Sequence, residues 1–189
     1  MKKLFILGVF LVVAFCAVNA FASTSQTVNV SATVPTTNGL SVDIHKVIGS
    51  AWTTATAINF GTLTWDSTDN IFRPLDGASF VLDVNITENS GTSWTVTHNR
   101  SSLVSGSNNI DNNVNVSFVK ATTSSESDLE KVSFYNSDGK IFTKETLSDG
   151  WLRIYYGIAS GSGDASGVTP LGASTVAGTY TGSVTLTLS

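Results

Sequence analysis

The side chains best suited to acid–base chemistry are few and scattered along this chain. Histidine titrates closest to neutral pH, and the two histidines, His45 and His98, fall in separate stretches with the alternating pattern of β-strands. Glu126, Asp128 and Glu130 lie close together in the sequence, but their neighbours are polar and would not desolvate them for catalysis. No Gly-x-Ser-x-Gly motif is present to expose a serine nucleophile. We therefore expect no enzymatic activity.

Ligands for a metal ion or a phosphate group are no better organised. Residues 161–167 read Gly-Ser-Gly-Asp-Ala-Ser-Gly and resemble a phosphate-binding loop, yet neither a helix pattern nor a lysine follows them. Asp66, Asp69 and Asn70 carry the oxygen atoms that calcium prefers, and so do residues 108–113. Neither group has the spacing of a calcium-binding loop, and both are typical of solvated turns. The sequence predicts no metal site and no cofactor.

Tryptophans suggest a different chemistry, in which indole rings stack on sugars. Trp94 and Trp151 begin or lie within apolar strand patterns, so we expect them in the core. Trp52 and Trp65 have no such placement, and their burial decides between a core role and an aromatic platform. A self-contained secreted module that binds carbohydrate or adheres to a surface is therefore kept as an alternative function.

The first 22 residues have the parts of a secretory signal peptide. Met-Lys-Lys is followed by an apolar run over residues 4–18, and Ala20-Phe21-Ala22 supplies small residues for cleavage. The run is shorter than the roughly 20 residues that span a bilayer. We predict that residues 1–22 are removed, that Ser23 begins the mature protein, and that export follows the general secretory route.

Composition limits the classes of partner. The one cysteine, Cys16, lies in the predicted signal peptide, so the mature protein has no disulfide and must be held together by its core. The formal net charge is −4, and no run of lysine or arginine occurs. Because affinity for nucleic acid comes mainly from clustered basic side chains, we expect no nucleic-acid partner.

Beyond the signal peptide, apolar and polar residues alternate over short stretches separated by glycine, asparagine, aspartate and serine. A period of two is typical of strands with one buried face, and no stretch has a helical period of useful length. The sequence therefore predicts an all-β protein, an antiparallel β-sandwich in one domain. The expected strands span residues 28–34, 40–47, 57–65, 79–87, 93–98, 114–121, 131–135, 140–143, 151–159 and 180–188.

Turn signals add detail to this prediction. The most apolar strands, which should form the interior, are 82–86, 114–118, 152–158 and 184–188. Hairpin turns are expected at 89–91, 136–139 and 148–150, one helical turn at 127–130, and exposed loops at 99–113 and 157–176. The last of these is glycine-rich, which is typical either of a binding element or of a loosely ordered protrusion.

Both ends of the mature chain have the pattern of a strand with one apolar face. Near the start, Val28, Val30, Ala32 and Val34 alternate with polar residues, and Pro35 ends the stretch because it has no N–H to donate. Near the end, one face carries Tyr180, Val184, Leu186 and Leu188. A strand at the border of a sheet must pair with another strand or be covered, so the partner of the last strand decides the function.

Residues 27–35, Thr-Val-Asn-Val-Ser-Ala-Thr-Val-Pro, followed by Leu-Ser-Val-Asp at 40–43, resemble the start of colonisation-factor-type pilins of the alternate chaperone–usher class. Residues 177–189 resemble the C-terminal strand of these pilins and also the end of spore-coat-protein-U-like domains. The latter usually carry cysteines, which the mature chain lacks, so the pilin resemblance is favoured. The resemblance covers only the two ends of the chain.

The pilin resemblance implies an immunoglobulin-like sandwich that lacks one strand. A periplasmic chaperone first fills the gap, and the N-terminal extension of the next subunit replaces it at an usher, which builds a fimbrial fibre or coat at the cell surface. This implies a signal peptide at 1–22, a donor strand and linker at 23–39, and a sandwich at 40–189. The donor residues would be Val28, Val30, Ala32 and Val34, and the groove edge would be Tyr180, Val184, Leu186 and Leu188. Residues 27–34 also suit the first strand of their own sandwich, and the sequence leaves both interpretations open.

Overall fold

The structure is a computed structural model that describes residues 31–33, 38–88, 93–134 and 139–189. The chain divides into two units, Met1–Pro35 and Thr36–Ser189, and the second contains the strands described below. Every strand pair in it is antiparallel, and most strands belong to two sheets that do not close into a barrel. The prediction of an all-β, antiparallel sandwich in one domain is confirmed.

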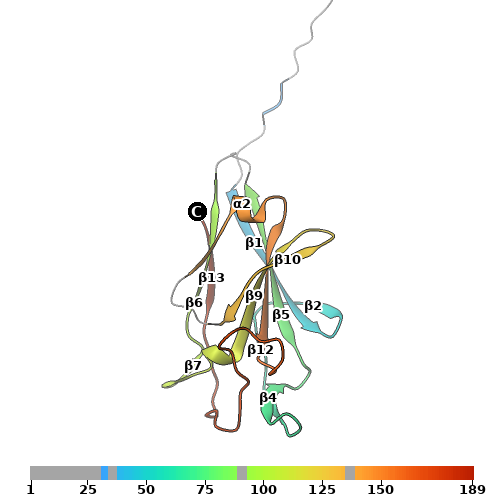
Figure 1. Ribbon diagram of the computed structural model, residues 1–189. Helices are drawn as coiled ribbons and strands as arrows, with labels where there is room; N and C mark the ends of the chain where they lie inside the picture. The colour runs from blue at the N-terminus through green and yellow to red at the C-terminus, as the bar shows by residue number, and fades with distance from the viewer. Residues whose placement is uncertain (1–30, 34–37, 89–92, 135–138) are drawn as a thin grey trace, which may run out of the picture. The chain divides into compact units, whose positions relative to one another are not determined.

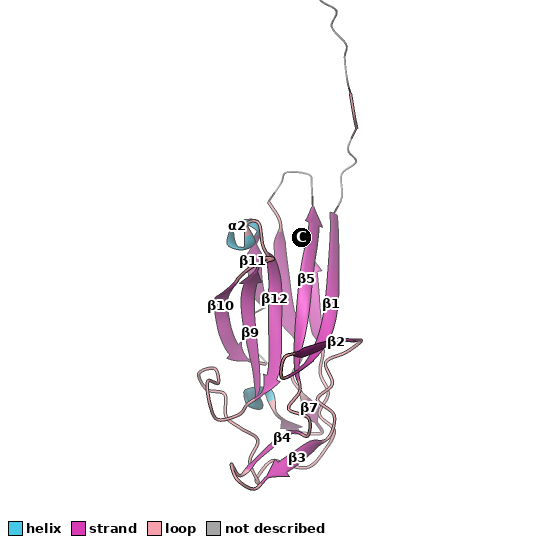
Figure 2. Cartoon of the chain, turned by 90° about the vertical axis from the view of Figure 1, so that its right-hand side faces the viewer, coloured by secondary structure: helices cyan, strands magenta, loops and turns pink. Residues whose placement is uncertain are grey.

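The larger sheet has six strands, and most of them are labelled in Figure 2. Its central strands β5, β9 and β12 are rich in valine, isoleucine and phenylalanine, which suit a pleated and buried surface. In spatial order, its strands are β10 (Glu126–Ser133), β9 (Val114–Ala121), β12 (Trp151–Ile158), β5 (Ser79–Glu88), β1 (Asn38–Ile48) and β2 (Ala51–Ala55).

The smaller sheet has β6 (Thr95–Arg100) at its centre, with β11 (Lys140–Thr143) on one side and β13 (Val184–Leu188) on the other. Two short strand pairs lie outside both sheets (Figure 1), and they are β3 (Leu63–Asp66) with β4 (Ile71–Pro74), and β7 (Val104–Ser105) with β8 (Asn108–Asn109). The described residues also form two short helical elements, η1 (Asp111–Asn113) and α2 (Lys144–Leu147). Thr143 caps the N-terminus of α2, where its side chain accepts a hydrogen bond from the amide of Thr146.

The hydrophobic core is made of residues from both sheets, as in a sandwich. Alternate residues of β5, β9 and β12 point inward, because successive side chains of a strand face opposite sides. Together with residues of β6, β11 and α2 they form one cluster, whose buried members include Phe80, Leu82, Val84, Val96, Phe118, Phe142, Leu147, Leu152, Ile154 and Tyr156.

The predicted hairpins at 89–91, 136–139 and 148–150 are wrong. The strands that they should join belong to different sheets: β5 and β6, β10 and β11, and β11 and β12. Each connection therefore carries the chain from one sheet to the other. Residues that favour tight turns are equally suited to such crossings, so composition alone does not separate the two cases.

Three further predictions are corrected. The helical turn at 127–130 is part of β10, because pairing with β9 satisfies its backbone and overrides the capping signal. Of the strand predicted at 57–65 only β3 forms, while Ile58 and Phe60 pack on the core from irregular chain. Residues 184–188 form a strand at the border of the smaller sheet rather than in the interior.

The predicted surface loop at 157–176 overlaps the end of β12, which reaches Ile158. The residues after Ile158 include buried side chains and do not form a protrusion. Leu171 is buried and its carbonyl accepts from the amide of Phe72 at 2.7 Å. Ala159, Ala165 and Val168 form a small buried cluster of their own. The predicted loop at 99–113 contains β7, β8 and η1, which local composition did not indicate.

Candidate strand-docking edge

One side of the sandwich ends at β13, a strand that has a partner on only one side. β13 pairs with β6, and no strand of the described chain pairs with its other side. Val184, Leu186 and Leu188 alternate with exposed threonines and pack on the core, yet they are only half-buried. Their neighbours on β6 are Val96, which pairs with Leu188, and His98, which pairs with Leu186, and both are fully buried. Burial therefore drops from β6 to β13, as expected for a strand with an uncovered edge.

The first half of β1 is the corresponding border of the six-stranded sheet. β2 pairs only with Ile44–Ile48, so residues 38–43 have β5 on one side and no strand of the described chain on the other. Val42 lies opposite Val84, and both side chains face the core side of the sheet. Val84 is fully buried, whereas Val42 is 36% exposed. Solvent therefore reaches the core side of the sheet at β1.

These two borders lie near each other and carry little charge. The Cα atoms of β1 and β13 approach within 8 Å of one another. β13 has the sequence Val-Thr-Leu-Thr-Leu, and Asp43 is the one charged residue among residues 38–43. Natural proteins usually protect unpaired edges with charges, proline or a covering segment. Within the described residues, this pair of edges therefore has little of the protection that usually prevents a further strand from pairing.

The structure places the residues that the sequence singled out as follows. Val184, Leu186 and Leu188 line the edge at β13, whereas Tyr180 precedes the strand and its hydroxyl donates to the carbonyl of Val176 at 2.6 Å. Ala32 is exposed and lies outside any strand. The other proposed donor residues, Val28, Val30 and Val34, lie outside the described residues. The second wall of the edge, at β1, was missed, although its alternation was visible in the sequence.

Polar side chains of β6 support the core beneath β13. His98 is fully buried, and its Nε2 lies 2.6 Å from the hydroxyl of Tyr156 on β12. Burial, aided by the charge of Arg100, lowers the pKa of His98 to about 3, so the ring is neutral at physiological pH. Burial also lowers the pKa of Arg100, whose Nη1 donates to the carbonyl of Ser133 at 3.0 Å. Both contacts connect the smaller sheet to the larger one.

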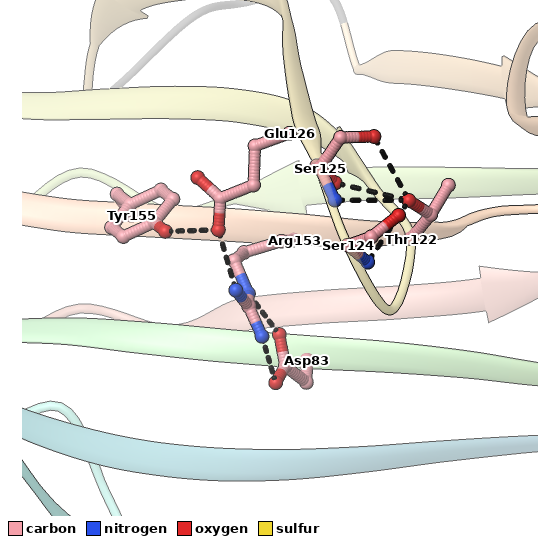
Figure 3. A network of polar contacts seen from close by, with 7 residues as sticks. All are labelled: Asp83, Thr122, Ser124, Ser125, Glu126, Arg153 and Tyr155. Atoms are coloured by element: carbon pink, nitrogen blue, oxygen red, sulfur yellow. Dashed lines mark hydrogen bonds and ion pairs between the residues drawn. The ribbon is translucent and has the colours of Figure 1, made fainter.

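The outer face of the six-stranded sheet carries a network centred on Arg153 (Figure 3). Its guanidinium donates to both carboxylate oxygens of Asp83, at 2.6 and 2.7 Å. It also donates to the carboxylate of Glu126 at 2.5 Å, and the same carboxylate accepts from the hydroxyl of Tyr155. The bond to Asp83 raises the pKa of Arg153, and burial with Glu126 raises the pKa of Tyr155 to about 12. At neutral pH neither group exchanges protons, so the network joins β5, β12 and β10 as a structural clamp.

The four tryptophans are all partly exposed. Trp94 and Trp151, expected in the core, are only half-buried. Trp52 and Trp65 are 43% and 41% exposed, so the alternative of a surface-binding module stays open. The guanidinium of Arg153 lies 5.0 Å from the ring centroid of Trp52, and Trp65 packs edge-on against Phe72.

The remaining chemical candidates are engaged in local structure. Asp66 accepts from the amides of Thr68 and Asp69, and Arg73 forms ion pairs with both aspartates. Asp111 accepts from the amide of Leu103 at 2.7 Å. His45 lies beside Trp52, with ring centroids 5.6 Å apart, rather than beside the buried His98.

Within the part of the chain that the structure describes, no group of three histidine, cysteine, aspartate or glutamate residues is arranged to hold a metal ion. In the same residues, no helix has the length and apolar character to cross a membrane. Comparisons with family models, with curated proteins and with solved structures found no match to this chain. The candidate site therefore rests on the geometry of β1 and β13.

Proposed function

We propose that this protein is a structural subunit of an extracellular fibre or surface coat, in which a strand of one subunit fills the open edge of the next. The observation that supports this most is the exposure of Val42 and of the inner face of β13 on the core side of the sandwich. The donated strand is residues 27–34, whose four apolar side chains alternate with polar ones. Its partners are other copies of this chain or related subunits.

The geometry of strand addition sets one requirement. A strand inserted between β1 and β13 lies about 4.8 Å from each, so its neighbours must stand roughly 9.5 Å apart. The two strands approach within 8 Å, so they must separate where they are closest. The donated backbone then pairs with both free edges, and alternate side chains enter the space between the sheets.

Burial supplies the driving force. A fully buried valine contributes about 1.5–3 kcal/mol, and alanine contributes less. Val28, Val30 and Val34 would together stabilise the contact by several kcal/mol before the cost of ordering the segment. A chaperone that lends a strand during export would protect the same edge until assembly, since an exposed apolar edge is an aggregation hazard.

Assembly is tested with matched substitutions in the secreted chain. Val30→Asp places a charge on the apolar face of the donor, while Ser31→Asp places the same charge on its polar face. Val42→Asp alters the acceptor, and Ser41→Asp, at an exposed neighbouring residue, is its control. Size-exclusion chromatography should show multimers for the wild type and both serine variants, and monomers for both valine variants.

A peptide test completes the design. A peptide copying residues 26–35 should bind the folded Val30→Asp variant and raise its Tm, whereas the same peptide carrying Asp at position 30 should not. A wild-type chain that stays monomeric at every concentration and ignores the peptide would overturn the proposal. The donated-strand model would then fail, and the self-contained binding module would become the better interpretation.

A further inference from the structure

A shallow pocket that is open to solvent, with a volume of about 430 Å³, lies at one end of the six-stranded sheet, where β5 ends and β12 begins; it is called the cavity below. Its lining combines the rings of Trp94 and Trp151 with the polar side chains of Asn85, Thr87 and Asp149. This size falls within the usual range of small-molecule sites, about 300–1,000 Å³. The cavity shares no residue with the donor segment.

The cavity lies where the pairing between β5 and β12 ends. β12 pairs with β5 only as far as Leu152 opposite Val84, whereas Trp151 pairs only with Ala121 of β9, and the residues before Trp151 lead back to α2. β5 continues to Glu88, with β1 as its partner on the other side. Residues 85–87 therefore present a backbone edge that has no strand partner on the side of β12 within the described chain.

The two indole rings are held in place but keep their polar atoms available. Trp94 packs partly on the core, and the guanidinium of Arg153 lies 6.0 Å from the ring centroid of Trp151. Neither indole N–H has a hydrogen-bond partner among the described residues, and neither is shut off from solvent. Tryptophan with one apolar surface and one free donor is suited to ligands that are partly apolar and partly hydroxylated.

We propose that this cavity binds a neutral pyranose, as a free sugar or at the end of a glycan. One face of a pyranose ring is covered by C–H groups and stacks on an indole, while its hydroxyls bond to amide, carboxylate and backbone groups such as those of Asn85 and Asp149. The charged lining includes two carboxylates, Glu88 and Asp149, and one ammonium group, Lys144, so an anionic sugar is not favoured. This site does not depend on the proposed fibre function.

Fluorescence of a reduced-tryptophan variant tests the site. The chain has four tryptophans, so Trp52→Phe with Trp65→Phe leaves Trp94 and Trp151 as the only indole emitters. The full secreted chain with these changes is titrated with the methyl pyranosides of glucose, galactose, mannose and N-acetylglucosamine, up to roughly tens of millimolar. We expect at least one of them to change the emission saturably.

Variants in that background locate the site. Asn85→Ala and Asp149→Ala should each raise the Kd at least tenfold, while Asn109→Ala and Asp128→Ala, at exposed positions outside the cavity, should leave it unchanged. Circular dichroism and Tm confirm that each variant is folded. No response to any of the four sugars, or equal Kd values in all variants, overturns the proposal. The readout is independent of assembly and can be repeated with Val30→Asp, so its failure is distinct from failure of the fibre model.

Discussion

The two sides of the sandwich manage their strand edges in opposite ways. On one side, β10 and β11 are joined by the ion pair of Lys140 and Glu130 at 2.7 Å, and Phe134 and Phe142 beside them are 4% and 6% exposed. On the other side, β1 and β13 have no such bridge among the described residues, and Val42 is 36% exposed. The same fold thus has one closed border and one open border.

The closed border shows what protection of an edge requires. β10 carries Glu126, Asp128, Glu130 and Lys131, and its pairing with β9 shifts register between Asp128 and Glu130. Charges and irregularities of this kind discourage a further strand from pairing. β13 offers threonines and a regular register instead. Under the proposed function, this difference would restrict strand addition to the side of β1 and β13.

The largest expected effect is on the free energy of unfolding, and it compares a buried side chain on the closed side with a partly exposed one on the open side. Phe142→Ala should lower the free energy of unfolding by about 3–5 kcal/mol, because it leaves a cavity among buried aromatic rings. Val42→Ala, on the open side, should cost about 1 kcal/mol or less in the monomer, since its side chain is partly solvated already. Urea unfolding of both variants measures the difference. Equal costs would break the comparison.

A smaller effect concerns acid, which should weaken the sheet that carries the open edge. The pKa of His98 is about 3 in the folded protein and about 6.5 when unfolded, so the unfolded chain binds more protons between these values. The contribution of His98 to the free energy of unfolding is therefore fully present above pH 6.5. It falls by about 1.4 kcal/mol for each pH unit below this value, which amounts to about 3 kcal/mol at pH 4.

Unfolding of His98→Gln at both pH values isolates this contribution, because glutamine keeps a polar group near Tyr156 but does not titrate. The wild type should lose about 3 kcal/mol more than this variant on going from pH 6.5 to pH 4. His45→Gln, outside the core, is the matched control. Identical losses in the wild type and His98→Gln would show that the buried histidine does not govern acid sensitivity.

The smallest effect is at the ion pair that closes the protected side. Lys140→Gln should reduce the free energy of unfolding by about 0.2–1 kcal/mol, because both partners are partly solvated. The loss should shrink in high salt, which screens the pair. Denaturant titrations at low and high salt measure it, with Lys46→Gln, which removes the pair with Asp76, as a comparison at another surface site. A salt-independent loss would point to packing instead.

The sequence predicted the strands better than their arrangement. The apolar segments 82–86, 114–118 and 152–158 were correctly expected in the interior, where Val84, Phe118 and Ile154 are buried, because apolar patterning is a local property of the chain. It did not show that β5 and β6 lie in different sheets, because turn residues serve hairpins and crossings alike. The segment from Ser127 to Glu130 was misread because a capping pattern does not show that these residues pair with β9, the strand that directly precedes them.

Of the two walls of the candidate site, the sequence predicted the one at β13 but not the one at β1. The apolar face of β13 was visible in Leu186 and Leu188, but its position at a border depends on which strands surround it. The opposite wall at Val42 could be recognised only from the structure, where the pairing of β1 with β2 extends no further than Ile44. The cavity beside Trp94 and Trp151 depends on where β12 separates from β5, which no local pattern encodes.

The pairing of β6 with β13 also has a kinetic consequence. The backbones of Thr95 and Ser189 exchange hydrogen bonds although 94 residues separate them. Contacts between such distant segments form slowly, because a long loop must close before any bond repays its entropy. During that interval, β6 lacks β13 and a second edge is open. Refolding yield should therefore fall as chain concentration rises, since a neighbouring molecule can reach β6 before the chain's own last strand does.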